Sequence, residues 1–376
     1  MNTTIFCKRK LLIGIGLLFL YLSGHSQDVH KVSSSSDQSP LIHSISGTSI
    51  PVKELDAFIQ QAMEKVQMPG LSIAIINEGE VVYHRTFGVA HQETQRLLLP
   101  THLLEAASLS KPLFAYFVMK MVDKGVLDLD KPMVEYFPHP GIDSTSQEFA
   151  TLVTPRMILC HSAGFTNWTQ GAPIHIAFEP GTGFSYSGEA YQYLTAVLGM
   201  QLGIGWQARL DSVFQAEVAI PLGMEHSYYT WNETIAKQKV MGHDQNGQPT
   251  TNTDKVTTFW AAHSLHSEAG DYAKFLLEMM HPQHLPLALR DEMLLEQIAF
   301  PPGHELLETG QSGWGLGFAR QENEHGMRYL HTGNNHDFQS FCAFYLQQQY
   351  GLVFFTNSDK AKAFYDLLGP YLKDEF

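Results

Sequence analysis

The sequence is poor in cysteine, with three residues in 376, and it contains neither Cys-x-x-Cys nor His-Glu-x-x-His despite its 19 histidines. Cys7 lies in the N-terminal segment described next, which leaves Cys160 and Cys342. These two either form a disulfide in an oxidising compartment or stay as buried thiols. The pairs at 263 and 266 and at 281 and 284 are interpreted as loop or surface histidines. We therefore expect no metal site.

The apolar run Leu11–Leu22 is too short to span a bilayer as a mature helix. It follows three basic residues at positions 8–10 and precedes the small and polar residues 23–26. This pattern is typical of a cleaved secretory signal peptide, here residues 1–26. Because the run is not followed by a cysteine, we expect no lipid anchor. The expectation is a periplasmic or secreted protein without a stable membrane anchor after cleavage.

Basic residues are also scarce, with 24 Lys and Arg against 38 Asp and Glu, for a net charge of −14. Removal of the signal peptide takes away three positive charges and lowers the net charge to −17. Such a chain is repelled by other polyanions, so nucleic acid and anionic lipid are not expected as partners.

The rest of the chain predicts a leader and one domain. Residues 27–50 are polar and rich in serine, which favours a disordered leader. Residues 51–376 are predicted to form an α/β (α+β) domain: an antiparallel sheet flanked by helices, with an inserted all-α subdomain. The α/β part covers about 51–107 and 281–376, and the helical part about 108–280. Predicted helices are 53–67, 108–124, 154–160, 190–202, 270–277 and 360–372, and predicted strands are 71–76, 81–87, 313–318, 327–331, 339–346 and 351–357.

Ser108 and Lys111 form the one Ser-x-x-Lys sequence of the chain. Because Pro112 is tolerated only in the first turn of a helix, a helix should begin near Ser108. Residues three apart on a helix share a face, so the amine would reach the hydroxyl. A serine nucleophile needs an adjacent base, and a lysine can serve when burial lowers its pKa. With 25 serines and 16 lysines, about one such spacing is expected by chance, so the motif needs support.

Tyr186 lies in the glycine-rich loop 179–188. A tyrosine beside Ser108 and Lys111 would pass a proton as a phenolate if the lysine cation lowered its pKa. The alternative is an ordinary surface-loop residue, since the chain has 15 tyrosines.

His331, Thr332 and Gly333 end a predicted strand. Thr332 would hydrogen-bond a substrate carboxylate or carbonyl, and Gly333 would let a substrate approach the backbone. The backbone N–H groups of Asn334 and Ser108 would together form an oxyanion hole. The alternative is a β-turn with a polar start.

Taken in chain order, these sequences resemble the motifs of the serine β-lactamase and penicillin-binding protein-like superfamily, in particular its class C β-lactamase-type branch. Ser108–Lys111 is similar to the first motif of that branch. Tyr186–Gly188 is similar to Tyr-x-Asn, and His331–Gly333 to Lys-Thr-Gly. Intervening stretches such as Leu159–Phe165 are also similar to this branch of the superfamily. The resemblance covers about residues 53–370.

The resemblance implies a β-lactamase/transpeptidase-like fold and a serine hydrolase that needs no cofactor. Ser108 would attack an ester or amide carbonyl and form an acyl-enzyme, with Lys111 and Tyr186 moving the proton. The substrate would be a small molecule or peptide: a β-lactam, a D-amino-acid peptide or a small ester.

Two residues depart from the family pattern. Gly188 replaces an Asn whose amide would contact the acyl side chain, and His331 replaces a lysine that would help bind a carboxylate. A histidine is only partly charged at neutral pH. Both changes weaken recognition of a β-lactam, so esters or small amides are at least as strongly indicated.

Three other activities are alternatives to this hydrolase. An acyltransferase would share the first half-reaction and pass the acyl group to a hydroxyl or amine. A penicillin-binding or sensor protein would acylate and then turn over slowly. An α/β-hydrolase lipase would need Gly-x-Ser-x-Gly, which the sequence lacks.

Overall fold

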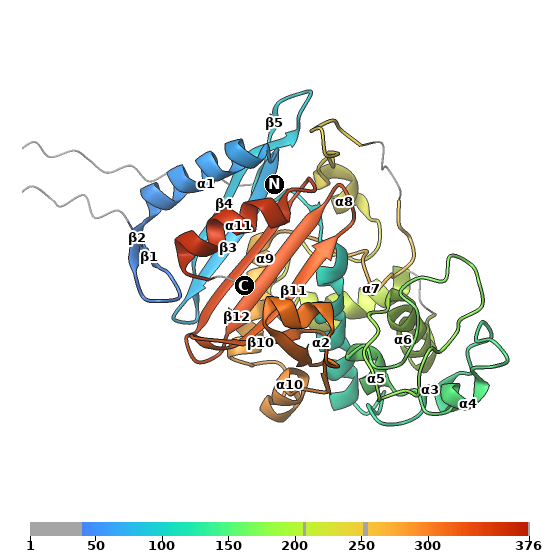
Figure 1. The fold of residues 1–376 in the computed structure, drawn as a ribbon. Helices are drawn as coiled ribbons and strands as arrows, with labels where there is room; N and C mark the ends of the chain where they lie inside the picture. Colours follow the sequence, from blue (N-terminus) through green and yellow to red (C-terminus); the bar gives the residue numbers. More distant parts are fainter. Residues whose placement is uncertain (1–39, 206–207, 251–254, 375–376) are drawn as a thin grey trace, which may run out of the picture. The chain divides into compact units, whose positions relative to one another are not determined.

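The structure is a computed structural model that describes residues 40–205, 208–250 and 255–374 (Figure 1). The expected signal peptide and most of the expected leader lie outside the described residues. The last part of that leader is not disordered, because β1 (Leu41–His43) and β2 (Ser49–Pro51) form a hairpin. Ile42 and Ile50 pair across it and are buried. The high serine content concealed these two apolar anchors.

A nine-stranded antiparallel sheet forms the centre of the domain, as the sequence predicted. The strands that precede the helical part meet those that follow it where β3 pairs with β13, with Ile73 opposite Phe354. In sheet order the strands are β5 (Arg96–Leu97), β4 (Glu80–His91), β3 (Gly70–Asn77), β13 (Tyr350–Thr356), β12 (Gln339–Tyr345), β11 (Gly326–Asn334), β10 (Ala319–Asn323), β9 (Gln311–Trp314) and β8 (Ile298–Ala299).

Helices dominate the middle of the chain, and a two-stranded ladder of β6 (Leu104–Glu105) and β7 (His266–Ser267) closes this region. Within the described residues, no helix is both long and apolar enough to cross a bilayer. The helices are α1 (Val52–Val66), η1 (Ala107–Leu109), α2 (Ser110–Asp123), α3 (Met133–Tyr136), α4 (Gln147–Ala150), α5 (Pro155–Leu159), α6 (Gly188–Gln201), α7 (Ala208–Phe214), η2 (Gln215–Ala219), α8 (Glu233–Gln238), α9 (Ala269–Met280), α10 (Leu287–Leu294), η3 (Glu305–Thr309) and α11 (Ala361–Leu372).

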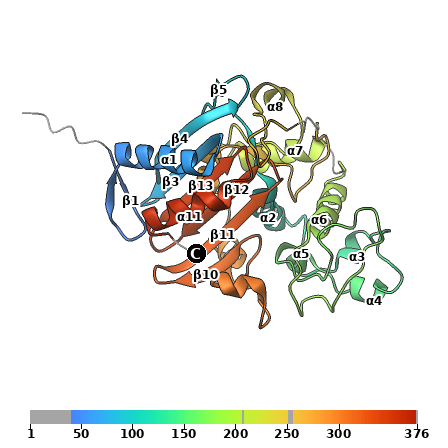
Figure 2. The ribbon, with the colours of Figure 1, turned by 45° about the horizontal axis from the view of Figure 1, so that its top comes forward.

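Two layers of helices cover the sheet, and β13 shows how its sequence produces them. Neighbouring residues of a strand point to opposite faces. Phe354 packs against Phe364 of α11, whereas Phe355 packs against Tyr272 of α9. Helices α1 and α11 therefore lie on one face, joined by the stacked rings of Phe58 and Tyr371, and α9 lies on the other face (Figure 1). Seen from the sheet, helices α3 to α6 gather beyond α2 (Figure 2).

One predicted strand, 313–318, is in fact divided. β9 ends at Trp314, and β10 begins at Ala319. Gly317 has a φ of 94°, and the N–H of Gly315 donates to the carbonyl of Phe318 at 2.8 Å. The glycines therefore form a tight turn, and the alternating pattern continues in a second strand.

A buried ion pair attaches the C-terminal end of the chain to the sheet. Arg328 of β11 lies 3.2 Å from the carboxylate of Asp374, and both side chains are fully buried. The guanidinium also donates to Gln321 at 2.8 Å and to Tyr365 at 2.6 Å. Removal of one partner from such a pair leaves an uncompensated buried charge.

We predict that Asp374→Ala lowers the free energy of unfolding by about 3–5 kcal/mol. The matched control is Asp366→Ala on α11, which removes an exposed pair with Lys362 and should cost less than about 0.5 kcal/mol. Urea titration followed by circular dichroism measures both. Equal losses for the two variants would contradict the prediction.

Candidate active site

Ser108 stands on a strained turn at the start of α2, at the position predicted for it. The residue before it, Ala107, has a φ of 50°, which is unfavourable for any residue with a Cβ. Ser110 donates its hydroxyl to the Ala107 carbonyl at 2.6 Å and accepts the N–H of Leu265 at 3.0 Å. These bonds fix the turn that carries Ser108, whose side chain is half-buried.

Gly333 supports this turn from β11. A Cβ on Gly333 would lie 2.2 Å from the Ser340 hydroxyl and 2.4 Å from the Ala106 carbonyl. The missing side chain therefore lets the strand pack against the Ser108 turn. This contact differs from the sequence prediction, in which Gly333 gave a substrate access to the backbone.

Lys111 is buried directly behind the nucleophile. Its Nζ donates to the Ser108 hydroxyl at 3.2 Å and to the carbonyl of Ala262 at 2.8 Å. The amine also lies 4.7 Å from the centre of the Tyr186 ring and 5.7 Å from that of Tyr191. Burial among these groups lowers the pKa of Lys111 to about 7, so a large fraction is the neutral base near neutral pH.

Tyr186 also reaches the nucleophile, but its ionisation differs from the prediction. It shares a side-chain hydrogen bond with Ser108, which lowers its pKa, while burial raises the pKa by more. The net pKa of Tyr186 is therefore above the ordinary value, and the side chain is a neutral phenol. The sequence argument assumed a lysine cation beside it, whereas burial makes Lys111 lose its proton first. Of the two, Lys111 is the group fitted to act as base.

His331 lies behind the phenol and is uncharged. Burial, and then repulsion by Lys111, lower its pKa to about 3. Its Nδ1 lies 2.7 Å from the Thr332 carbonyl, which can only accept, so Nδ1 carries the proton. Nε2 then carries a lone pair. This atom is buried and has no hydrogen-bond partner among the described residues.

A cavity of about 280 Å³ opens on Ser108. Three predicted residues besides Ser108 border it: Lys111, Tyr186 and Asn334. His331, Gly333, Thr332 and Gly188 do not belong to its lining. Thr332 pairs with Phe341 on the α11 face of the sheet, away from Ser108. The other residues lining the cavity are Asn167, Trp168, Ala262, His263, Asn335 and His336.

Sequence reasoning missed these additional lining residues. They come from loops without periodicity, and none belongs to a motif that the resemblance covers. Of the pair at 263 and 266, expected in a loop or at the surface, His266 is instead buried in β7, and burial lowers its pKa to about 4. His263 borders the cavity, and burial also lowers its pKa to about 4.

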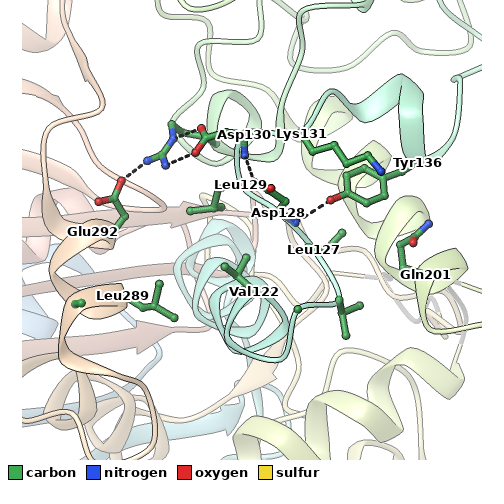
Figure 3. A pocket seen from close by; sticks show the side chains of 14 residues that line it. Val122, Leu127, Asp128, Leu129, Asp130, Lys131, Tyr136, Gln201, Leu289 and Glu292 are labelled. Carbon is green, nitrogen blue, oxygen red and sulfur yellow. Dashed lines mark hydrogen bonds and ion pairs between the residues drawn. The ribbon is translucent and has the colours of Figure 1, made fainter.

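A second, larger hollow of about 840 Å³ lies beside the C-terminal end of α2 (Figure 3). Its one arginine, Arg156, is neutralised by a bidentate pair with Asp130 at 2.6 and 2.8 Å and by an ion pair with Glu292. The lining contains no serine, cysteine or histidine. The hollow therefore lacks a serine or cysteine nucleophile, and the Ser108–Lys111 pair points to the smaller cavity.

One group of possible metal ligands, His226, Glu268 and Asp271, occurs among the described residues. Its carboxylates already have partners. Glu268 caps α9 by accepting the N–H groups of Gly270 and Asp271, each at 2.6 Å. Asp271 accepts from the backbone of His226 at 2.5 Å and pairs with Lys274 at 2.8 Å. These contacts account for the group without an ion. Cys160 and Cys342 are free, buried thiols, which decides between the two alternatives left open above.

Comparisons with known proteins show the family and the fold. The sequence profile of the Beta-lactamase family matches residues 55–373. The chain belongs to the beta-lactamase family. Among curated relatives of this beta-lactamase-family protein, "Esterase EstB" of Burkholderia gladioli is 27% identical over 248 residues, which cover 58% of this chain and 61% of that relative.

Solved structures share the fold. The octameric penicillin-binding protein homologue from Pyrococcus abyssi has a TM-score of 0.71 and 22% identity, over 87% of this chain and 78% of its own. D-alanine carboxypeptidase AmpC from Burkholderia cenocepacia has a TM-score of 0.69 and 19% identity, over 85% and 99%. The family match and these structures agree on a β-lactamase/transpeptidase-like fold.

The lowered pKa of Lys111 predicts the pH profile. If neutral Lys111 is the base, kcat/KM for an ester rises with pH and levels off above about pH 7. Lys111→Arg keeps the charge but stays protonated, so it should lower kcat/KM by about 10²–10⁴. Stopped assays from pH 5 to 9, corrected for hydroxide hydrolysis, measure both effects. A flat profile with intact circular dichroism would contradict this role.

Proposed function

We propose that this protein cleaves small, uncharged esters through an acyl-enzyme on Ser108. The observation that carries the proposal is the hydrogen bond of 3.2 Å between Ser108 and a buried Lys111 whose pKa is about 7. This pair supplies a nucleophile and its base at neutral pH. The described cavity opens on the same hydroxyl.

In the proposed mechanism, neutral Lys111 takes the Ser108 proton as the hydroxyl oxygen attacks the ester carbonyl. The N–H groups of Ser108 and Asn334 stabilise the oxyanion. The protonated amine then returns the proton through the Tyr186 phenol to the leaving alcohol, and the acyl group stays on Ser108. Water attacks this acyl-enzyme with the same groups acting in reverse.

The charges around the cavity favour an uncharged substrate. Among the described residues that line it, Lys111 is the one lysine or arginine, and it must be neutral to act. His331 and His263 are also neutral, because burial lowers their pKa values to about 3 and about 4. A substrate carboxylate would lose its hydration without meeting a fixed cation. This supports esters over β-lactams and D-amino-acid peptides, which carry carboxylates.

We predict that the purified protein turns over p-nitrophenyl acetate with a kcat/KM at least tenfold above that for nitrocefin. Ser108→Ala should lower the ester rate by about 10³ or more, because the nucleophile is lost. Mass spectrometry should find an acetyl group on Ser108 during turnover. The matched control is Ser162→Ala, a buried serine outside the cavity, which should retain activity.

Turnover that survives in Ser108→Ala would contradict the proposed nucleophile. A burst of p-nitrophenol without acetate would instead mean slow deacylation, and formation of an acetylated alcohol or amine would mean an acyltransferase. Faster hydrolysis of nitrocefin than of the ester would contradict the preference for uncharged substrates.

A further inference from the structure

Gly188 makes room for the ring of Trp168. A Cβ built on Gly188 would lie 2.3, 2.5 and 2.8 Å from three carbons of the indole, distances that real Cβ atoms do not show. The φ angle of Gly188 is not in the left-handed range, so its backbone would accept another residue. The glycine is needed here for space, and that space is filled by the tryptophan.

The loop that carries Trp168 is fixed in place along the start of α6. The side chain of Asn167 accepts the N–H of Gly188 at 2.9 Å, and its carbonyl accepts the N–H of Glu189 at 2.9 Å. Two serines before Gly188 bind the same loop. Ser185 donates to the Phe165 carbonyl at 2.8 Å, and Ser187 to the Thr166 carbonyl at 2.7 Å. On the other side of Trp168, the N–H and the hydroxyl of Thr169 donate to the Glu189 carboxylate at 3.3 Å. Trp168 is therefore held on both sides, although 40% of its surface is exposed.

The exposed part of the indole faces the cavity at Ser108. Trp168 and His263 both line that cavity, and their rings meet edge to face with centres 5.6 Å apart. His263 in turn stacks on Trp260 at 5.7 Å and 26°. Packed aromatic rings thus form one part of the cavity wall beside the nucleophile. Flat aromatic surfaces favour flat, apolar partners, which gain about two- to tenfold in affinity beyond area burial.

We propose that Trp168 is the residue that selects the acyl group, and that it favours a planar, uncharged aromatic acyl group over a puckered or bulky one. Asn167 is a positioning residue that holds Trp168 through Gly188. The cavity volume of about 280 Å³ is just below the lower limit of about 300 Å³ for pockets that hold drug-sized ligands. A cavity of this size is suited to a small acyl group. The inference rests on the proposed function and specifies its substrate class.

The test compares two esters of nearly equal size, p-nitrophenyl benzoate and p-nitrophenyl cyclohexanecarboxylate. Release of p-nitrophenol gives kcat/KM for each, and the benzoate-to-cyclohexanecarboxylate ratio is compared between variants, which cancels intrinsic ester reactivity. We expect Trp168→Leu to lower this ratio about two- to tenfold. Trp168→Phe keeps a flat ring and should recover at least half of the loss on a logarithmic scale.

Two further variants separate the contact from a general disturbance. The matched control Trp231→Leu removes a tryptophan outside the cavity lining and should leave the ratio unchanged. Gly188→Ala should displace the indole and lower the ratio as Trp168→Leu does. In a Trp168→Leu background, Gly188→Ala should add nothing, because there is no indole left to displace.

An unchanged ratio in Trp168→Leu would overturn the inference, as would an equal effect of Gly188→Ala with and without the indole. If Trp168→Leu fails to fold by circular dichroism, Gly188→Ala and Trp168→Phe decide the question. Ser108→Ala, assayed with the same esters, separates the two levels. Activity that survives in it overturns the proposed function, whereas its loss together with an unchanged ratio overturns this inference alone.

Discussion

The candidate site depends on the exclusion of water from the amine of Lys111. Lys111 is 1% exposed, and its pKa is lowered by burial rather than by a neighbouring cation. The contacts of its Nζ are a hydroxyl, a backbone carbonyl and the faces of two tyrosines. A protonated Nζ would therefore have polar but uncharged partners. A carboxylate near Nζ would restore the proton and remove the base. The neutrality of the surrounding groups is thus as necessary as the amine.

The scaffold around α2 is arranged to keep that amine in place. Tyr272 donates its phenol to the Leu109 carbonyl at 2.8 Å, and Tyr229 donates to the Ser110 carbonyl at 2.6 Å. Both phenols are buried, which raises their pKa values and keeps them as donors. Together with Gly333 below the turn, they maintain the unfavourable φ of Ala107. The strain at the nucleophile is therefore balanced by contacts from three separate segments of the chain.

The parts of the site that the sequence revealed are those set by local geometry or by a familiar motif. Ser108 and Lys111 lie within one helical turn, so their spacing alone predicts contact. The ionisation of Tyr186 was predicted with the wrong sign, because it depends on burial by distant residues. Trp168 left no signal, since its place is defined by Gly188, 20 positions away, through loop contacts without periodicity. The discontinuous antiparallel sheet was predictable, because its strands alternate and are bounded by turns.

The two departures from the family pattern have a common physical consequence. Position 188 is a glycine, and the ring of Trp168 occupies the space of the missing side chain. Position 331 is a histidine that burial keeps neutral. Neither position therefore carries the hydrogen-bonding side chain or the cation of the family pattern, while the hydrogen bond between Ser108 and Lys111 is intact. This is the basis of the proposal that the site selects against charged substrates without loss of its nucleophile, in which recognition and acylation are carried by separate residues.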